Sequence, residues 1–135
     1  MANSFQFELV SPERLLLSGQ VAHVVLPGAE GDMTVMANHA PLMTTIRPGF
    51  VTVKSTEGRE DRFVVLGGFA DIAAEGCTLL AEYATPVDAF NKDELTRRIE
   101  AARSAAAAAK TDDEKLSAES FLHQLTTLEG AIIPA

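Results

Sequence analysis

The sequence has 135 residues, of which 47% are hydrophobic and 22% are charged, enough for one ordinary domain or a small domain with an appendage. Its formal net charge of -8 argues against a nucleic-acid-binding protein and against direct adhesion to anionic lipid, because both need a basic face. The single cysteine, Cys77, cannot form an internal disulfide and is typical of a reducing compartment. We expect no signal peptide and no direct membrane insertion, since no apolar run approaches the ~20 residues of a membrane span.

The chain up to Pro86 has the periodicity of β-strands. Apolar and polar residues alternate from Phe5 onward, and turns are expected at Glu57-Gly58 and Glu75-Gly76. The pair Gly67-Gly68 inside an apolar stretch indicates a bulge or a close backbone contact. No helical pattern separates the strands, so parallel crossovers are not expected, and a β-sandwich or flattened barrel is favoured. The expected strand segments are 5–10, 21–26, 33–36, 50–55, 62–66, 69–73 and 77–84.

The chain after Pro86 predicts two helices, so we divide it into a β-sandwich domain, residues 1–86, and a helical hairpin domain, residues 87–135. Asn91 with Glu94, and Thr111 with Glu114, have the spacing of capping boxes. Two residues between the helices favour antiparallel pairing. The apolar stripe of the first helix is Leu95, Ile99, Ala102 and Ala106.

The second helix has an apolar stripe and an expected end. Gly130 is predicted to end this helix, and Pro134 to block its continuation. The predicted stripe is Leu116, Phe121, Leu122, Leu125 and Leu128.

Catalytic and metal-binding patterns are not evident. His23, His39 and His123 are scattered over a strand, a loop and a helix, and Cys77 is expected to be a small buried hydrophobe. The glycines match no phosphate-binding loop, so no cofactor and no metal are expected. A β domain with a helical hairpin and no catalytic machinery favours a binding or coupling protein over an enzyme.

Six motifs, in order, resemble the epsilon subunit of bacterial F-type ATP synthases, the counterpart of the mitochondrial delta subunit. They are FQFELVSPER at residues 5–14, LPGAEGD at 26–32, NHAPL at 38–42, RPG at 47–49, VLGGF at 65–69 and LLAE at 79–82. The resemblance implies a sandwich of about ten strands followed by two helices. It implies a non-catalytic rotor subunit of the central stalk, which couples proton flow to ATP synthesis on the cytoplasmic face of the bacterial inner membrane.

The resemblance also implies partners. The loop of Glu30, Gly31 and Asp32 corresponds to the contact with the c-ring, where its carboxylates would pair with basic loops. The alternative is that these carboxylates only solvate a hairpin. The contact with the gamma subunit is carried over to His39, Pro41 and Leu42, although His39 could equally fix its own loop by a hydrogen bond.

In some members of the family the hairpin extends toward the alpha and beta subunits of the catalytic head and blocks hydrolysis, and some members bind ATP. The ATP motif is degenerate here, because Asp88 is kept while Asn91 and Lys92 replace the arginine and alanine. Arg97 or Arg98 could substitute one turn later. The second helix is acidic, so we expect a hairpin that is packed on the sandwich and inhibits weakly. Two other interpretations stay open, a free-standing sensor domain with a regulatory hairpin and a small β-sandwich enzyme.

Overall fold

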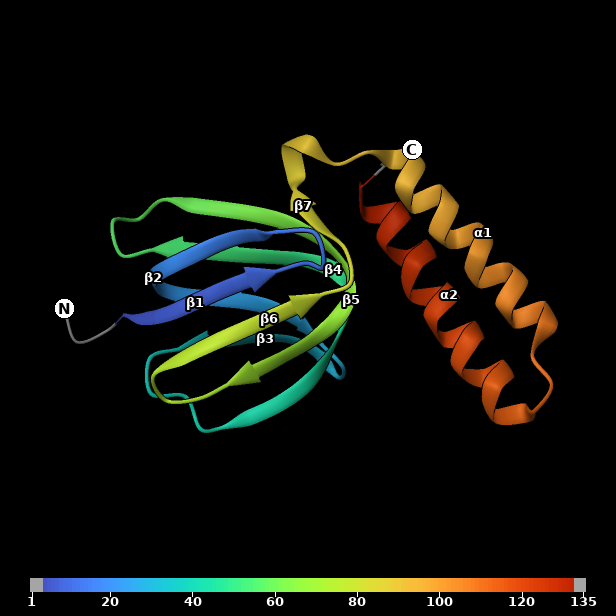
Figure 1. Ribbon diagram of the computed structural model, residues 1–135, viewed down its shortest axis with the longest axis horizontal. Coiled ribbons are helices and arrows are strands. Elements are labelled where there is room, and N and C mark those ends of the chain that lie inside the picture. The colour runs from blue at the N-terminus through green and yellow to red at the C-terminus, as the bar shows by residue number, and fades with distance from the viewer. Residues whose placement is uncertain (1–3, 133–135) are drawn as a thin grey trace. The chain divides into compact units, whose positions relative to one another are not determined.

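The computed structural model describes residues 4–132 and divides into two compact units, Met1–Phe90 and Asn91–Ala135 (Figure 1). The first unit holds all the strands and a short 3-10 helix, and the second holds two helices in contact with each other. Within residues 4–132, no helix is long and apolar enough to cross a membrane. The elements are β1 (Phe5–Val10), β2 (Leu15–Gly28), β3 (Gly31–Met36), β4 (Leu42–Ser55), β5 (Glu60–Ile72), β6 (Gly76–Ala81), β7 (Ala84–Pro86), η1 (Val87–Ala89), α1 (Lys92–Ala108) and α2 (Asp112–Ile132).

The strands of the first unit form one sheet that closes on itself, which confirms the predicted flattened barrel. Around the ring, β1 pairs with β2, β2 with β4, β4 with β5 and β5 with β6, all antiparallel. The ring closes where β6 pairs with β1 in parallel. No parallel pair was expected, because no helix connects the strands. The prediction failed because the antiparallel strands between β1 and β6 themselves form the connection.

Seven strands are present in the described residues, instead of about ten. The strands β2, β4 and β5 are long, with 14, 14 and 13 residues. Register shifts and glycines let such strands bend without ending, so segments 62–66 and 69–73 form a single strand. Segment 77–84 was predicted as one strand but is divided into β6 and β7 at Glu82 and Tyr83.

Gly67 and Gly68 make this continuous strand possible. Both have positive φ, at 100° and 138°, a conformation that residues other than glycine rarely adopt. A Cβ atom on Gly68 would lie 2.2 Å from the carbonyl oxygen of Leu80 on β6. The predicted bulge or close backbone contact is therefore confirmed, and the glycines are needed where β5 approaches β6.

The barrel interior is filled by the inward side of the alternating strands. Phe5, Phe7 and Leu9 of β1 are buried while the residues between them are partly exposed, as the period of two predicts. Together with the other strands they form one continuous core. Its further members are Val21, Val24, Leu26, Val35, Ile46, Val51, Val53, Phe63, Val65, Ala70, Ile72, Cys77, Leu79, Ala81 and Ala84.

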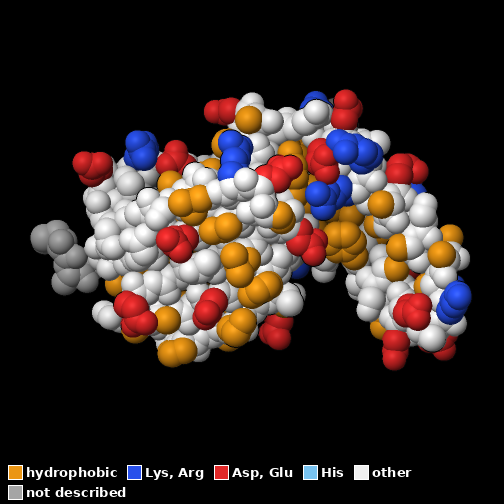
Figure 2. All heavy atoms as spheres, in the orientation of Figure 1, with side chains coloured by type: hydrophobic (Ala, Val, Ile, Leu, Met, Phe, Trp, Pro, Cys, Tyr) orange, Lys and Arg blue, Asp and Glu red, His pale blue; other side chains and the backbone are white. Residues whose placement is uncertain are grey.

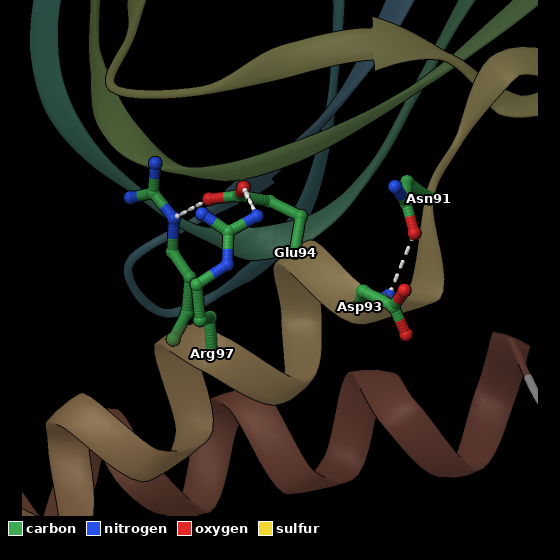
Figure 3. Close-up of polar contacts among 5 residues, drawn as sticks. Asn91, Asp93, Glu94 and Arg97 are labelled. Carbon is green, nitrogen blue, oxygen red and sulfur yellow. Dashed lines mark hydrogen bonds and ion pairs between the residues drawn. The ribbon is translucent and has the colours of Figure 1, made fainter.

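The first helix begins at a capping asparagine. The side-chain oxygen of Asn91 accepts a hydrogen bond from the Asp93 N–H at 2.8 Å (Figure 3). Glu94 does not return a bond to Asn91, as a capping box would require. Its carboxylate pairs with Arg97 at 2.6 Å and Arg98 at 2.8 Å, because charged donors on the next turn outcompete a backbone N–H. These arginines lower the pKa of Glu94.

The second helix is capped as predicted at its start but not at its end. The Thr111 hydroxyl accepts from the Glu114 N–H at 3.1 Å, while the Glu114 carboxylate accepts from the Lys110 N–H at 3.4 Å, one residue earlier than expected. Gly130 does not end the helix, which continues to Ile132, and Pro134 lies outside the described residues. Gly130 keeps negative φ, so its flexibility alone did not terminate the helix.

The predicted stripes hold in part. Leu95, Ile99 and Ala102 of α1 are buried, as are Leu125 and Leu128 of α2. The prediction of the apolar stripe of α2 is wrong at its first residue. Leu116, in the second turn of the helix, is 67% exposed, and Phe121 and Leu122 are only partly buried.

We expect Gly68→Ala to lower the free energy of unfolding by at least about 2 kcal/mol, because it adds both backbone strain and overlap with β6. Gly19→Ala is the matched control, since a Cβ atom there has no neighbour within 4 Å. The control should change stability by less than about 1 kcal/mol. Urea unfolding of both variants measures the difference, and equal effects would contradict the role of the close approach.

Burial of Cys77, aided by the charge of Asp71, raises the pKa of its thiol to about 12. In the unfolded chain a thiol ionises near ~8.5, so the folded state keeps its proton where the unfolded state has lost it. The resulting stabilisation is complete below about pH 8.5 and is lost as the pH rises toward 12.

We therefore expect the stability of the natural chain to fall, relative to Cys77→Ala, by about 1.4 kcal/mol per pH unit above pH ~9. Unfolding curves of both chains between pH 7 and 10.5 test this. Parallel stability profiles would show that the thiol does not stay protonated in the fold.

Candidate interaction surfaces

The acidic turn comprises residues 28–32 and joins β2 to β3. Gly28 pairs with Gly31, and Ala29 and Glu30 are the two exposed residues between them. Gly31 has a φ of +142°, a value that favours glycine. The sequence Gly-Ala-Glu-Gly thus forms a tight hairpin with Glu30 at its tip.

A single arginine from β4 contacts both sides of the acidic turn. The Arg47 Nε donates to the carbonyl oxygen of Gly28 at 2.6 Å. The Arg47 Nη2 donates to Asp32 Oδ1 at 3.2 Å. The side chain of Arg47 is 31% exposed and that of Asp32 is 74% exposed, so this is a partly covered ion pair.

The backbone around Arg47 is also fixed against the turn. Ile46, next to it, pairs with Gly28 across the β2–β4 ladder. A Cβ atom on Gly49 would lie 2.9 Å from the Pro27 Cβ, so the segment packs directly on the residue before the turn. The RPG motif therefore supports the LPGAEGD motif, although they are separated in the sequence.

The structure brings four of the six predicted contact residues together. A surface hollow of about 370 Å³ is lined by Glu30, Gly31, Asp32 and Leu42, with Gly28, Ala29, Met33 and Thr44. His39 and Pro41 do not line it. Leu42, which the resemblance assigns to the gamma contact, thus lies beside the residues assigned to the ring.

His39 lies in the loop before β4. Its Nδ1 is 2.6 Å from the carbonyl oxygen of Ala40, which is the loop-fixing contact considered for it. The preceding Asn38 has a φ of 65°, the only positive value at a described residue other than glycine, and its N–H donates to the Ala74 carbonyl at 3.1 Å. Pro41 is exposed. The loop is thus held by its own backbone and leaves Pro41 available to a partner.

The structure shows a second exposed surface, which was not predicted from the sequence. We call it the apolar strip, and it consists of Met43, Phe69, Leu80 and Val10, on β4, β5, β6 and β1. Phe69 pairs with Leu80, and Leu80 with Val10, so their outward side chains are adjacent. Met43 pairs with Asp71 and is the diagonal neighbour of Phe69. Met43, Phe69 and Leu80 are 65%, 40% and 39% exposed.

Figure 2 shows hydrophobic side chains gathered over this side of the β domain. A hollow of about 360 Å³ is lined by three members of the strip, Val10, Phe69 and Leu80, with Ser11, Pro12, Gly68, Ala81 and Glu82. Beyond it, the outward face of β1 and β2 carries a polar ladder, in which Gln6 donates to Ser18 at 3.0 Å and Gln20 to Gln6 at 3.2 Å. This polar ladder therefore marks one border of the apolar strip. The sequence did contain a sign of the apolar strip, because Phe69 and Leu80 are apolar residues at outward-facing positions of two predicted strands.

The described residues contain no group of three or more His, Cys, Asp or Glu side chains that could hold a metal ion. The two arginines that could replace the missing one of the ATP motif, Arg97 and Arg98, both pair with Glu94. A bound phosphate would have to displace that carboxylate from them.

Comparisons with known proteins agree over both parts of the chain. Residues 4–87 match the family model described as the β-sandwich domain of the ATP synthase delta/epsilon chain. The ATP synthase epsilon chain of Mesorhizobium japonicum is 64% identical over 135 residues, covering 100% of both chains. That of Brucella anthropi is 58% identical over the same length, again covering 100% of both chains.

Solved structures share the fold at lower identity. A chain in the mitochondrial ATP synthase of Euglena gracilis superimposes with a TM-score of 0.69 at 23% identity, covering 96% of this chain and 82% of that one. A chain in the central stalk and c-ring structure of the Tetrahymena thermophila enzyme gives a TM-score of 0.60 at 14% identity, covering 91% and 94%.

Proposed function

The chain belongs to the family of ATP synthase epsilon chains, and we propose that it joins the gamma subunit to the ring of c subunits. It is a non-catalytic subunit of the central stalk of an F-type ATP synthase. The observation that carries this assignment is the 64% identity over the full length, hairpin included. Family membership decides against the two other interpretations, a free-standing sensor and a small enzyme.

We propose that the gamma subunit covers the apolar strip. An exposed apolar patch on an acidic barrel is typical of a protein–protein interface, because water would otherwise solvate it at a cost in free energy. Met43 follows Leu42 directly on β4, so the strip is continuous in the chain with the residues assigned to gamma from the sequence, His39, Pro41 and Leu42. The polar ladder of β1 and β2 sets one border of this interface.

We propose that the acidic turn contacts the ring. Glu30 stands at the tip of a tight hairpin, exposed and without a hydrogen bond or ion pair to another described residue. A carboxylate in this position attracts a basic loop and fixes its register more than it adds affinity. Gly31 permits the hairpin, and Asp32 and Leu42 line the hollow beside it.

The chain is part of a membrane-associated complex, and we propose that it lies on the cytoplasmic face of a bacterial inner membrane, held there by its partners. The relatives named above are bacterial chains of the same length, which supports this location.

We propose that the hairpin contacts the alpha and beta subunits weakly and is a poor inhibitor of hydrolysis. On α2, Asp112, Asp113, Glu114 and Glu119 are exposed, against the single basic residue Lys115. A helix with this charge is repelled by acidic segments of a partner.

Disruption of the apolar strip should weaken gamma binding. We expect Phe69→Asp with Leu80→Asp to reduce the affinity for gamma at least tenfold, roughly the effect of losing one well-buried anchor. The side chains are exposed, so the fold should persist. Met36→Asp is the control, because Met36 is 56% exposed on β3, which among the described strands pairs with β2 alone. Titration of each purified variant with the gamma subunit gives the affinities, and equal losses in variant and control would contradict the assignment.

Truncation tests the hairpin. We expect the full chain and a chain ending at Pro86 both to bind an epsilon-depleted catalytic head. Neither chain should slow ATP hydrolysis by more than about twofold, which corresponds to ~0.4 kcal/mol of differential binding. Steady-state hydrolysis with each form measures this. Suppression by the full chain alone would identify the hairpin as an inhibitor and refute the charge argument.

A further inference from the structure

The acidic turn carries two carboxylates, but they are not equivalent. Asp32 is paired with Arg47, whereas Glu30 has no partner among the described residues. A paired carboxylate contributes little net field at a distance, because the cation beside it cancels most of the charge. The turn thus presents one uncompensated charge to a partner.

Arg47 is placed to hold that charge in position. Its guanidinium donates to the carbonyl oxygen of Gly28 at the start of the turn and to the carboxylate of Asp32 at its end, so one rigid group spans the two strands that carry Glu30. The backbone of its own segment is held by the Ile46–Gly28 pairing and by Pro27 over Gly49. A fork with two partners fixes an orientation that a single contact would leave free.

We propose that Arg47 is a positioning residue, which locks the acidic turn so that Glu30 alone makes the electrostatic contact with the ring. This inference rests on the proposed ring contact and adds two points to it. It assigns a role to a residue outside the turn, and it removes Asp32 from the residues that pair with the ring.

Removal of the Arg47 charge changes the affinity for the ring in opposite directions under the two explanations. Arg47→Ala removes a positive charge next to an acidic contact surface. If only net charge mattered, the variant would bind a basic ring loop more tightly. If Arg47 positions Glu30, the variant binds more weakly although it is more acidic.

The test measures the affinity of a catalytic head, depleted of this chain and restored with each variant, for membrane vesicles that contain the ring. We expect Glu30→Gln to weaken attachment about two- to fivefold, the range of one partly exposed ion pair. Arg47→Ala should weaken it by a similar factor. The double variant should be no weaker than either single one, because Arg47 acts through Glu30.

A matched control removes the same charge elsewhere. Arg59→Ala breaks the exposed pair of Arg59 with Asp61, 3.5 Å apart, and should leave attachment unchanged. Thermal unfolding of each chain verifies the fold, and Arg47→Gln, which keeps part of the aliphatic stem, replaces Arg47→Ala if that variant does not fold.

The outcomes separate the two claims. Unchanged attachment in Glu30→Gln overturns the proposed ring contact, and with it the role of Arg47. Weakened attachment in Glu30→Gln, together with unchanged or tighter attachment in Arg47→Ala, overturns the role of Arg47 alone. A double variant whose loss equals the product of the single losses does the same.

Discussion

Closure of the sheet is the constraint on which the β domain depends. The strand β1 hydrogen-bonds to β2 on one side and to β6 on the other, so the backbone groups of the ring strands find partners within the ring. The approach of β5 to β6 that this geometry requires leaves no space for a side chain at Gly68. Once the ring is closed, the apolar interior is full, and every residue available to a partner must lie on the outer surface or on the turns at its ends.

The outer surface is divided by chemistry rather than by shape. The apolar strip crosses β4, β5, β6 and β1, and a polar ladder begins on the outward side of β1 and β2. The acidic turn occupies the β2–β3 connection, where Arg47 of β4 contacts it. If gamma covers the strip and the ring meets the turn, this small subunit offers apolar contact to a permanent partner and charge to a contact that must keep its register.

Much of the architecture could be predicted from local pattern. Alternation located β1, the turn at Glu57-Gly58 lies between β4 and β5, and the turn predicted at Glu75-Gly76 runs into β6, which begins at Gly76. Asn91 and Thr111 both cap helices. The failures concern what local pattern does not encode. The β1–β6 pair joins residues about 70 positions apart. The second helix continues through Gly130, and Glu94 pairs with arginines instead of completing its capping box. The acidic turn was found from a motif, while Arg47 and the apolar strip required strand register, which fixes which side chains meet.

The parallel pairing of β1 with β6 has a consequence for how the molecule is made. During synthesis β1 is made well before its second partner, because Gly76–Ala81 lies about 70 residues further along the chain. Until then, one edge of β1 and the hydrophobic side chains of Phe5, Phe7 and Leu9 have no complete enclosure. The ring therefore cannot close before β6 has been made, and a nascent chain that ends before Gly76–Ala81 leaves one edge of β1 unpaired, which favours aggregation.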